Sequence, residues 1–182
     1  GEPMHQADFT INLLKEAKRR RINTAMETCG FCQWEDLKEA CEVLDTLLYD
    51  VKSMDPEKHR VFTGISNELI LENLGKAREA FPELAIWVRT PVIPGFNDDP
   101  EDIRRILMHI QGMPNTCFEA LDYHRMGKPK YEYLGLEFPM GDQKLDEEKI
   151  KRIHQMIRSE FPHLRSPGAA ENENLPNTAS QR

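Results

Sequence analysis

Apolar residues are spaced along the chain in two alternating ways. In some stretches they recur every three or four residues, which is the pattern of a helix with one buried face. Between these stretches lie short runs rich in leucine, aromatic and β-branched residues, which are typical of strands. The spacing predicts helices at residues 8–20, 34–41, 66–80, 101–111 and 146–160, a helical turn at 55–57, and strands at 22–27, 46–51, 85–92 and 116–123.

Residues that start and stop helices support these boundaries. Asp8 and Ser66 are suitable N-caps, and Pro100 suits the start of the helix that follows it. Pro91 fits a strand only at its end, because proline has no backbone N–H to donate. Residues 125–139 are polar with scattered aromatic residues, so we predict a loop there.

The order of the elements predicts an α/β fold. Strands that alternate with helices form βαβ units with right-handed crossovers, and hence a parallel sheet. Four strands are too few to close a barrel, which needs about eight in its standard form. We therefore expect a half-open sheet or a piece of a larger barrel, formed by residues 1–165. Residues 166–182 lack apolar periodicity, and we expect a disordered tail there.

The composition suits one domain with its own core. The chain has 182 residues, of which 39% are hydrophobic and 30% are charged, and its net charge is −7. This balance argues against non-specific binding to nucleic acid, which needs a basic face. The basic residues 18–21 end a predicted helix, and we interpret them as helix-end charges rather than a nucleic-acid patch. No apolar run has the length of a membrane span and there is no secretory signal, so we expect a cytoplasmic protein without a membrane partner.

The four cysteines, Cys29, Cys32, Cys41 and Cys117, do not suggest a disulfide framework in a chain of this size. Cys29 and Cys32 have the C-x-x-C spacing of a redox or metal-binding pair. No second pair is present to complete a zinc site, and the order of elements is not that of thioredoxin. We interpret Cys29 and Cys32 as two unconnected thiols near a loop.

Asp50 and Lys52 lie at the end of the predicted strand 46–51. Side chains two positions apart in a strand point to the same face, so the two charges either face a site or form an internal ion pair. The other strands also end in polar residues, and parallel strands bring these ends to one rim. A rim with both charge signs suits a ligand with a carboxylate, an amine and a ribose, since buried charges need partners. The rim residues are Glu27, Thr28, Asp50, Lys52, Arg89, Asp122 and His124, with Gly1, Glu2 and Pro3 as a candidate end of a further strand.

Several short motifs resemble the radical S-adenosylmethionine (SAM) enzymes that activate glycyl radical enzymes, above all the pyruvate formate-lyase activating enzymes. Gly1-Glu2-Pro3 resembles the tail of the GGEP motif of radical SAM enzymes. The other matching stretches read METCGF at 26–31, YDVKSMD at 49–55, HRVFTGISN at 59–67, RTPVIPG at 89–95 and DYHRMGK at 122–128. The resemblance covers roughly residues 1–160, and the motifs keep the family's order and spacing.

The resemblance implies a partial (β/α)6 barrel that holds a [4Fe-4S] cluster and SAM. In that family an electron passed to SAM cleaves it to methionine and a 5′-deoxyadenosyl radical, which takes a hydrogen atom from a backbone glycine of the partner. The resemblance therefore implies a glycyl radical enzyme such as pyruvate formate-lyase as the partner, and a flavodoxin-type reductant.

The resemblance also implies roles for residues at the rim. Gly1 and Glu2 would meet the methionine amine of SAM, with Pro3 setting the turn, and Lys52 and Arg89 would bind its carboxylate. The remaining implied roles are SAM contact for Asp50 and His124, monovalent-cation binding for Glu27, Thr28, the Leu48 carbonyl and Asp50, and a partner groove for Tyr123 and residues 125–131.

One departure from the family concerns the cluster. The family holds it with a C-x3-C-x2-C loop upstream of GGEP, and the 182 residues contain no such motif. Cys29 and Cys32 have the wrong spacing and position for this role. We therefore expect the C-terminal part of an activating enzyme, without 4Fe-4S ligands and inactive by itself, whose cut sheet edge self-associates.

Two other hypotheses remain open. A non-catalytic adaptor could keep the same sheet and dock onto a glycyl radical enzyme without a cluster. An unrelated α/β enzyme could use Asp50 and Lys52 as acid and base, although an ammonium paired with a carboxylate is a poor base.

Overall fold

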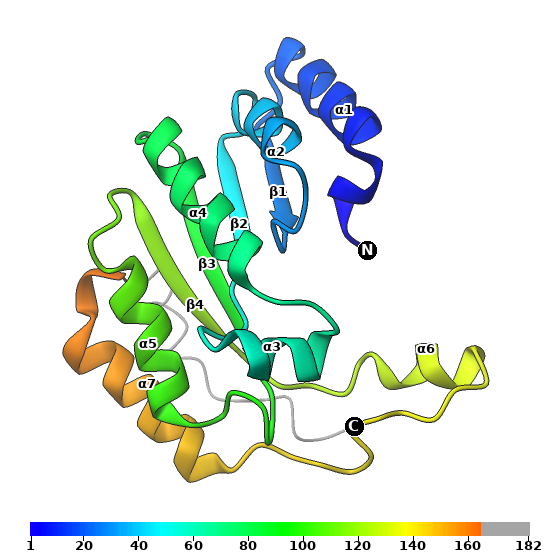
Figure 1. Ribbon diagram of the computed structural model, residues 1–182, viewed down its shortest axis with the longest axis vertical. Coiled ribbons are helices and arrows are strands. Elements are labelled where there is room, and N and C mark those ends of the chain that lie inside the picture. The colour runs from blue at the N-terminus through cyan, green and yellow to red at the C-terminus, as the bar shows by residue number, and fades with distance from the viewer. Residues whose placement is uncertain (165–182) are drawn as a thin grey trace.

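The computed structural model describes residues 1–164 (Figure 1). Residues 165–182, which include the predicted tail, lie outside the described part of the chain. The strands are β1 (Ala25–Thr28), β2 (Thr46–Asp50), β3 (Ala85–Val92) and β4 (Thr116–Asp122). The helices are α1 (Ala7–Arg19), α2 (Trp34–Cys41), α3 (Pro56–Thr63), α4 (Glu68–Ala80), α5 (Pro100–Ile110), α6 (Lys128–Tyr133) and α7 (Glu147–Glu160), with short 3-10 helices η1 (Pro3–Gln6) and η2 (Pro162–Leu164).

The four strands form one parallel sheet in the order β1-β2-β3-β4, which confirms the predicted α/β fold. Side chains alternate along the strands. Leu47, Tyr49, Ile86 and Val88 are buried in the core shared with the helices, whereas the residues between them are only partly buried on the other face. Among residues 1–164, β1 and β4 each pair on one side only, so the sheet is open at both edges.

The N-terminal elements differ from the prediction by a few residues. α1 follows directly on η1, so Asp8 lies in its first turn instead of capping it. β1 begins three residues later than predicted. The cause is Thr24, whose hydroxyl donates to the carbonyl of Val43 and whose amide donates to the carboxylate of Asp45. These contacts are distant in sequence, which is why strand composition alone does not reveal them.

Two helices go beyond the prediction. α3 has eight residues instead of one turn, because the Asp55 carboxylate accepts hydrogen bonds from two backbone amides at its start, and Gly64 ends it in the left-handed conformation. α6 lies in the stretch predicted as a loop. It buries none of its residues, so no apolar periodicity marks it in the sequence.

Two elements, the helix at 34–41 and the strand at 85–92, have the bounds that the sequence predicts. Three of the four basic residues at the end of α1 have carboxylate partners: Lys18 pairs with Asp45, and Arg19 and Arg20 pair with Glu16. Within residues 1–164, every helix is too short or too polar to cross a membrane.

The turn after β1 depends on a glycine that lies against a buried tyrosine. Gly30 has a φ of +69°, and a Cβ atom on it would lie 1.7 Å from the hydroxyl oxygen of Tyr49. Tyr49 is fully buried in β2 and donates its hydroxyl to the carbonyl of Ile70 in α4. The side-chain amide of Asn73, also in α4, donates to the carbonyls of Gly30 and Cys32. The turn, β2 and α4 are therefore packed together without room for a side chain at Gly30.

Replacing Gly30 with alanine should destabilise the protein by about 2–4 kcal/mol, because left-handed strain is added to an overpacked contact. Gly75 inside α4 is the matched control, since nothing lies within 4 Å of a Cβ atom placed there. Gly75→Ala should raise the free energy of unfolding by up to about 1 kcal/mol. Urea denaturation measures both changes, and a Gly30→Ala variant as stable as the wild type would contradict the described packing.

Candidate functional site

Asp50 and Lys52 form an ion pair at the end of β2. The Lys52 ammonium donates to the Asp50 carboxylate at 3.1 Å, and the two side chains are 26% (Lys52) and 21% (Asp50) exposed. The internal ion pair, one of the two alternatives for this stretch, is therefore present. Because both side chains keep part of their surface in solvent, the pair remains accessible to a ligand.

The register of the sheet places three charged residues level with one another on neighbouring strands. Asp50 in β2 pairs with Arg89 in β3, and Arg89 pairs with Glu119 in β4. Arg89 forms two ion pairs, through Nη1 with Glu27 at 2.8 Å and through Nε with Glu119 at 3.0 Å. A guanidinium has five N–H donors, so two such contacts leave donors for a further anion. We call Glu27, Asp50, Lys52, Arg89 and Glu119 the charged row.

Two parts of the charged row differ from the prediction. Arg89 lies inside β3, three residues before its end, and not at the end of its strand. It nevertheless reaches the rim, because β3 runs past the level of Asp50. Glu119 is absent from the predicted set. The sequence could have indicated Glu119, because it follows the buried Phe118 in a strand and so points to the opposite, partly buried face. A charge on such a face needs a partner.

The carboxylate of Glu2 is bound at the end of β1. It accepts hydrogen bonds from the backbone N–H of Met4 at 3.0 Å, the hydroxyl of Thr28 at 2.6 Å and the backbone N–H of Cys29 at 2.9 Å. Burial alone would raise the pKa of Glu2, but these hydrogen bonds outweigh it and hold the pKa below its ordinary value. The start of the chain is thereby fixed beside the strand end.

The remaining predicted SAM contacts fall into two groups. Gly1, Glu2 and Pro3 line a pocket of about 530 Å³ together with Glu27, so the structure brings these four residues together. His124 is exposed and lies two residues beyond the end of β4.

The residues predicted to bind a monovalent cation lie close together on neighbouring strands of the sheet, but their side-chain oxygens have other partners. Leu48 is level with Glu27 on the neighbouring strand. The carboxylates of Glu27 and Asp50 bind the two cations of the charged row, and the hydroxyl of Thr28 donates to Glu2. Within the described residues no three Cys, His, Asp or Glu side chains gather to hold a metal ion. The cation site stays a prediction.

Cys29 and Cys32 are unlinked, as the sequence predicts, and both are partly buried. Burial raises the pKa of both thiols, and it raises that of Cys32 to about 11. Both thiols therefore stay protonated at neutral pH, whereas the thiolate is the form that binds metals and acts as a nucleophile. The spacing of Cys29 and Cys32 differs from that of the C-x3-C-x2-C motif, as the sequence shows.

Comparison with known proteins identifies the relatives of the chain. No protein-family model matches it. The chain is 49% identical over 159 residues to the (2S)-3-sulfopropanediol sulfolyase activating enzyme of Bilophila wadsworthia, covering 87% of the chain and 53% of that relative. It is 34% identical over 164 residues to a pyruvate formate-lyase-activating enzyme of Listeria monocytogenes, covering 86% of the chain and 65% of that relative. The chain is a homologue of the activating enzymes of glycyl radical enzymes.

A solved structure of such an activating enzyme has the same fold. The domain of a pyruvate-formate lyase-activating enzyme from Bacteroides vulgatus matches with a TM-score of 0.68 at 28% identity, over 87% of the chain and 89% of that structure. A coproporphyrinogen III oxidase from Escherichia coli, which is described as a radical SAM enzyme, matches with a TM-score of 0.56 at 17% identity. This likeness shows the fold alone. The four-stranded unit is thus of the partial-barrel type. The chain spans about half the length of several activating enzymes that it matches.

Glu2 should make the protein more stable at neutral than at acid pH. The pKa of Glu2 is lower in the folded than in the unfolded chain. Its contribution to the free energy of unfolding is therefore fully present at pH values above the ordinary pKa of a glutamate, and it is lost as the pH falls through the folded-state pKa. Glu2→Gln should therefore flatten the fall of the free energy of unfolding on the acid side, measured by urea denaturation at several pH values. Glu42→Gln, at an exposed position, should keep the wild-type slope. The same slope in all three proteins would argue against the described Glu2 contacts.

Proposed function

We propose that the chain provides the SAM-binding strand ends of a radical SAM enzyme that activates a glycyl radical enzyme. The observation that carries the proposal is the charged row, in which two cations and three carboxylates meet on one face of the sheet. A ligand with both a carboxylate and an amine can pair with both signs. Homology to activating enzymes supports the same assignment.

Within this site, Lys52 and Arg89 bind the methionine carboxylate of SAM. The carboxylates of Glu27 and Glu119 hold the Arg89 guanidinium at Nη1 and Nε, which fixes the plane that it presents to a further anion. Glu2 and Gly1 meet the amine, and Asp50 hydrogen-bonds the ligand. The other proposed roles are the turn at Pro3, a position near the ligand for His124, and a monovalent cation held by Glu27, Thr28, the Leu48 carbonyl and Asp50.

When bound and cleaved to methionine by one electron from a reductant outside this chain, SAM would supply the 5′-deoxyadenosyl radical for removal of a hydrogen atom from a backbone glycine of the partner. The residues of this chain contribute by binding and orienting SAM. No step is assigned to a cluster in this chain, because its sequence lacks the C-x3-C-x2-C motif. We propose that the chain is inactive by itself and that the whole activating enzyme supplies the [4Fe-4S] cluster.

The proposed partner is a glycyl radical enzyme of the pyruvate formate-lyase type, with a flavodoxin-type reductant, in the cytoplasm. Tyr123 and residues 125–131 are proposed to line the groove for the partner. Residues 128–131 form the first part of α6, and Tyr133 at the end of α6 and Leu134 just beyond it are exposed. The open edge of β1 offers unpaired backbone groups, and we propose that it pairs with a second copy of the chain.

Titration calorimetry of the 182-residue chain with SAM tests the site. The wild type should bind SAM, and Lys52→Ala should weaken binding by roughly 10- to 100-fold, the loss expected for one charge-assisted hydrogen bond. Lys58 is the matched control, because it pairs with Asp102 at 2.6 Å and is 31% exposed, but lies in α3 outside the charged row. Lys58→Ala should bind SAM like the wild type.

Equal losses in Lys52→Ala and Lys58→Ala would contradict the assignment of the charged row. A chain that binds a glycyl radical enzyme but not SAM would favour the non-catalytic adaptor. A longer reading frame, reconstituted with iron and sulfide, should form 5′-deoxyadenosine from SAM under reduction, while this chain alone should not.

A further inference from the structure

The backbone that follows β2 is held by buried side chains from three other parts of the chain. The carbonyls of residues 51, 52 and 53 accept hydrogen bonds from the hydroxyl of Thr90 at 2.6 Å, the amide of Asn97 at 2.8 Å and the amide of Asn67 at 2.7 Å. Thr90 and Asn97 are 0% exposed and Asn67 is 2% exposed. The middle carbonyl of the three is that of Lys52, so the main chain of this cation is fixed from inside the protein.

Thr90 lies in β3 and bonds to the backbone after β2, whereas Asn97 joins the same two segments from a loop outside both strands. Its Nδ2 donates to the carbonyl of Lys52 at 2.8 Å and to the carbonyl of Pro91 at 2.9 Å. Its Oδ1 accepts the backbone N–H of Ile93 at 2.7 Å. Both N–H donors and the oxygen acceptor of the amide are thus used, between Lys52, two residues past the end of β2, and the end of β3. Arg89 lies two residues before Pro91, so one side chain spans the segments that carry both cations of the charged row.

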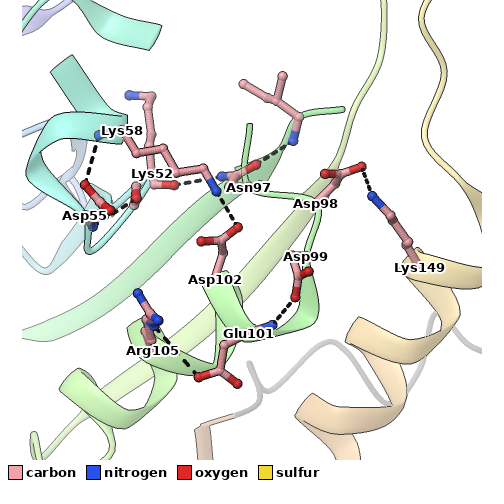
Figure 2. A network of polar contacts seen from close by, with 12 residues as sticks. Lys52, Asp55, Lys58, Asn97, Asp98, Asp99, Glu101, Asp102, Arg105 and Lys149 are labelled. Atoms are coloured by element: carbon pink, nitrogen blue, oxygen red, sulfur yellow. Dashed lines mark hydrogen bonds and ion pairs between the residues drawn. The ribbon is translucent and has the colours of Figure 1, made fainter. Parts of the chain in front are cut away.

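The loop that carries Asn97 is itself anchored on several sides (Figure 2). Asp98 pairs with Lys149 of α7 at 2.9 Å. Asp99 caps α5, and the ring of Phe96 stacks on Phe62 of α3 with centroids 4.4 Å apart. The amide is therefore fixed by contacts outside the two strands as well as by the strand ends themselves.

We propose that Asn97 is a positioning residue that fixes the spacing of Lys52 and Arg89, and that it acts through the main chain without touching the ligand. The role in SAM binding rests on the proposed function. An ionised carboxylate at this position has the same shape but no donor, so the oxygen that replaces Nδ2 would face the carbonyl oxygens of Lys52 and Pro91 as an acceptor, while the other oxygen could still accept from Ile93. Asn97→Asp should therefore push the two strand ends apart.

A buried asparagine can also serve stability alone, and the test must separate the two roles. Asn67→Asp is the matched control. It removes an equally buried amide donor from the carbonyl next to that of Lys52, but Asn67 lies at the start of α4 and makes no bond to β3. Both substitutions should lower the free energy of unfolding. Only Asn97→Asp should change the spacing of the strand ends.

The backbone N–H of Val51 reports on this spacing, because it donates to the carbonyl of Arg89 at 3.0 Å. Amide hydrogen exchange by NMR should show that Asn97→Asp speeds exchange at Val51 by roughly tenfold or more relative to core amides, while Asn67→Asp does not. If Asn97→Asp does not fold, Asn97→Ser, which keeps a hydroxyl donor, takes its place with the same expectation. Equal exchange at Val51 in the Asn97 and Asn67 variants would overturn the proposal.

SAM titration of the same variants tests the consequence for binding. Asn97→Asp should weaken SAM binding by roughly tenfold, which is the expected effect of one weakened charge-assisted contact. Asn67→Asp should bind SAM like the wild type. Equal affinities in the two variants would overturn the role of Asn97 in binding. If the wild-type chain does not bind SAM, the proposed SAM site fails, whereas exchange at Val51 still decides whether Asn97 sets the spacing.

Discussion

The register between β2 and β3 is the constraint on which the site depends. It places Asp50 level with Arg89, and the next pairing places Arg89 level with Glu119. A shift by one residue would turn these side chains to the other face, into the packed core. Charges cannot be placed there without large desolvation costs. The position of the charged row and the packing of the core are therefore fixed by the same pairing.

The balance of charge in the row explains how it can be stable without a ligand and still bind one. Each cation has a carboxylate partner within the chain: Lys52 has Asp50, and Arg89 has Glu27 and Glu119. Partly exposed pairs of this kind contribute little to stability, so their partners can be exchanged at small cost. A zwitterion offers replacement partners of both signs.

The elements that could be predicted are those fixed by local periodicity. The strand at 85–92 and the helix at 34–41 have the expected bounds because their patterns are clear over their whole length. Phe9 and Leu13 fit the apolar stripe of α1 by spacing, yet they are 65% and 57% exposed, since spacing does not say which part of a stripe meets the core. α6 buries no side chain and gives no pattern.

The same division holds for the candidate site. Asp50 and Lys52 are two residues apart, so strand geometry predicts that they share a face, while the choice between an ion pair and a site needed the structure. The contacts of Arg89 with Glu27 and Glu119 depend on the ladder register, and those of Asn97 depend on a loop that folds back onto two strands. Such contacts join residues far apart in the chain, and the spacing of polar residues in the sequence carries no signal for them.

If Lys52 and Arg89 recognise the carboxylate of SAM, a ligand without that carboxylate should bind more weakly. Titration calorimetry of the chain with SAM and with decarboxylated SAM, which keeps the sulfonium, the amine and the adenosine, isolates the carboxylate. Decarboxylated SAM should bind more weakly than SAM by roughly tenfold or more. Equal affinity for the two ligands would contradict it.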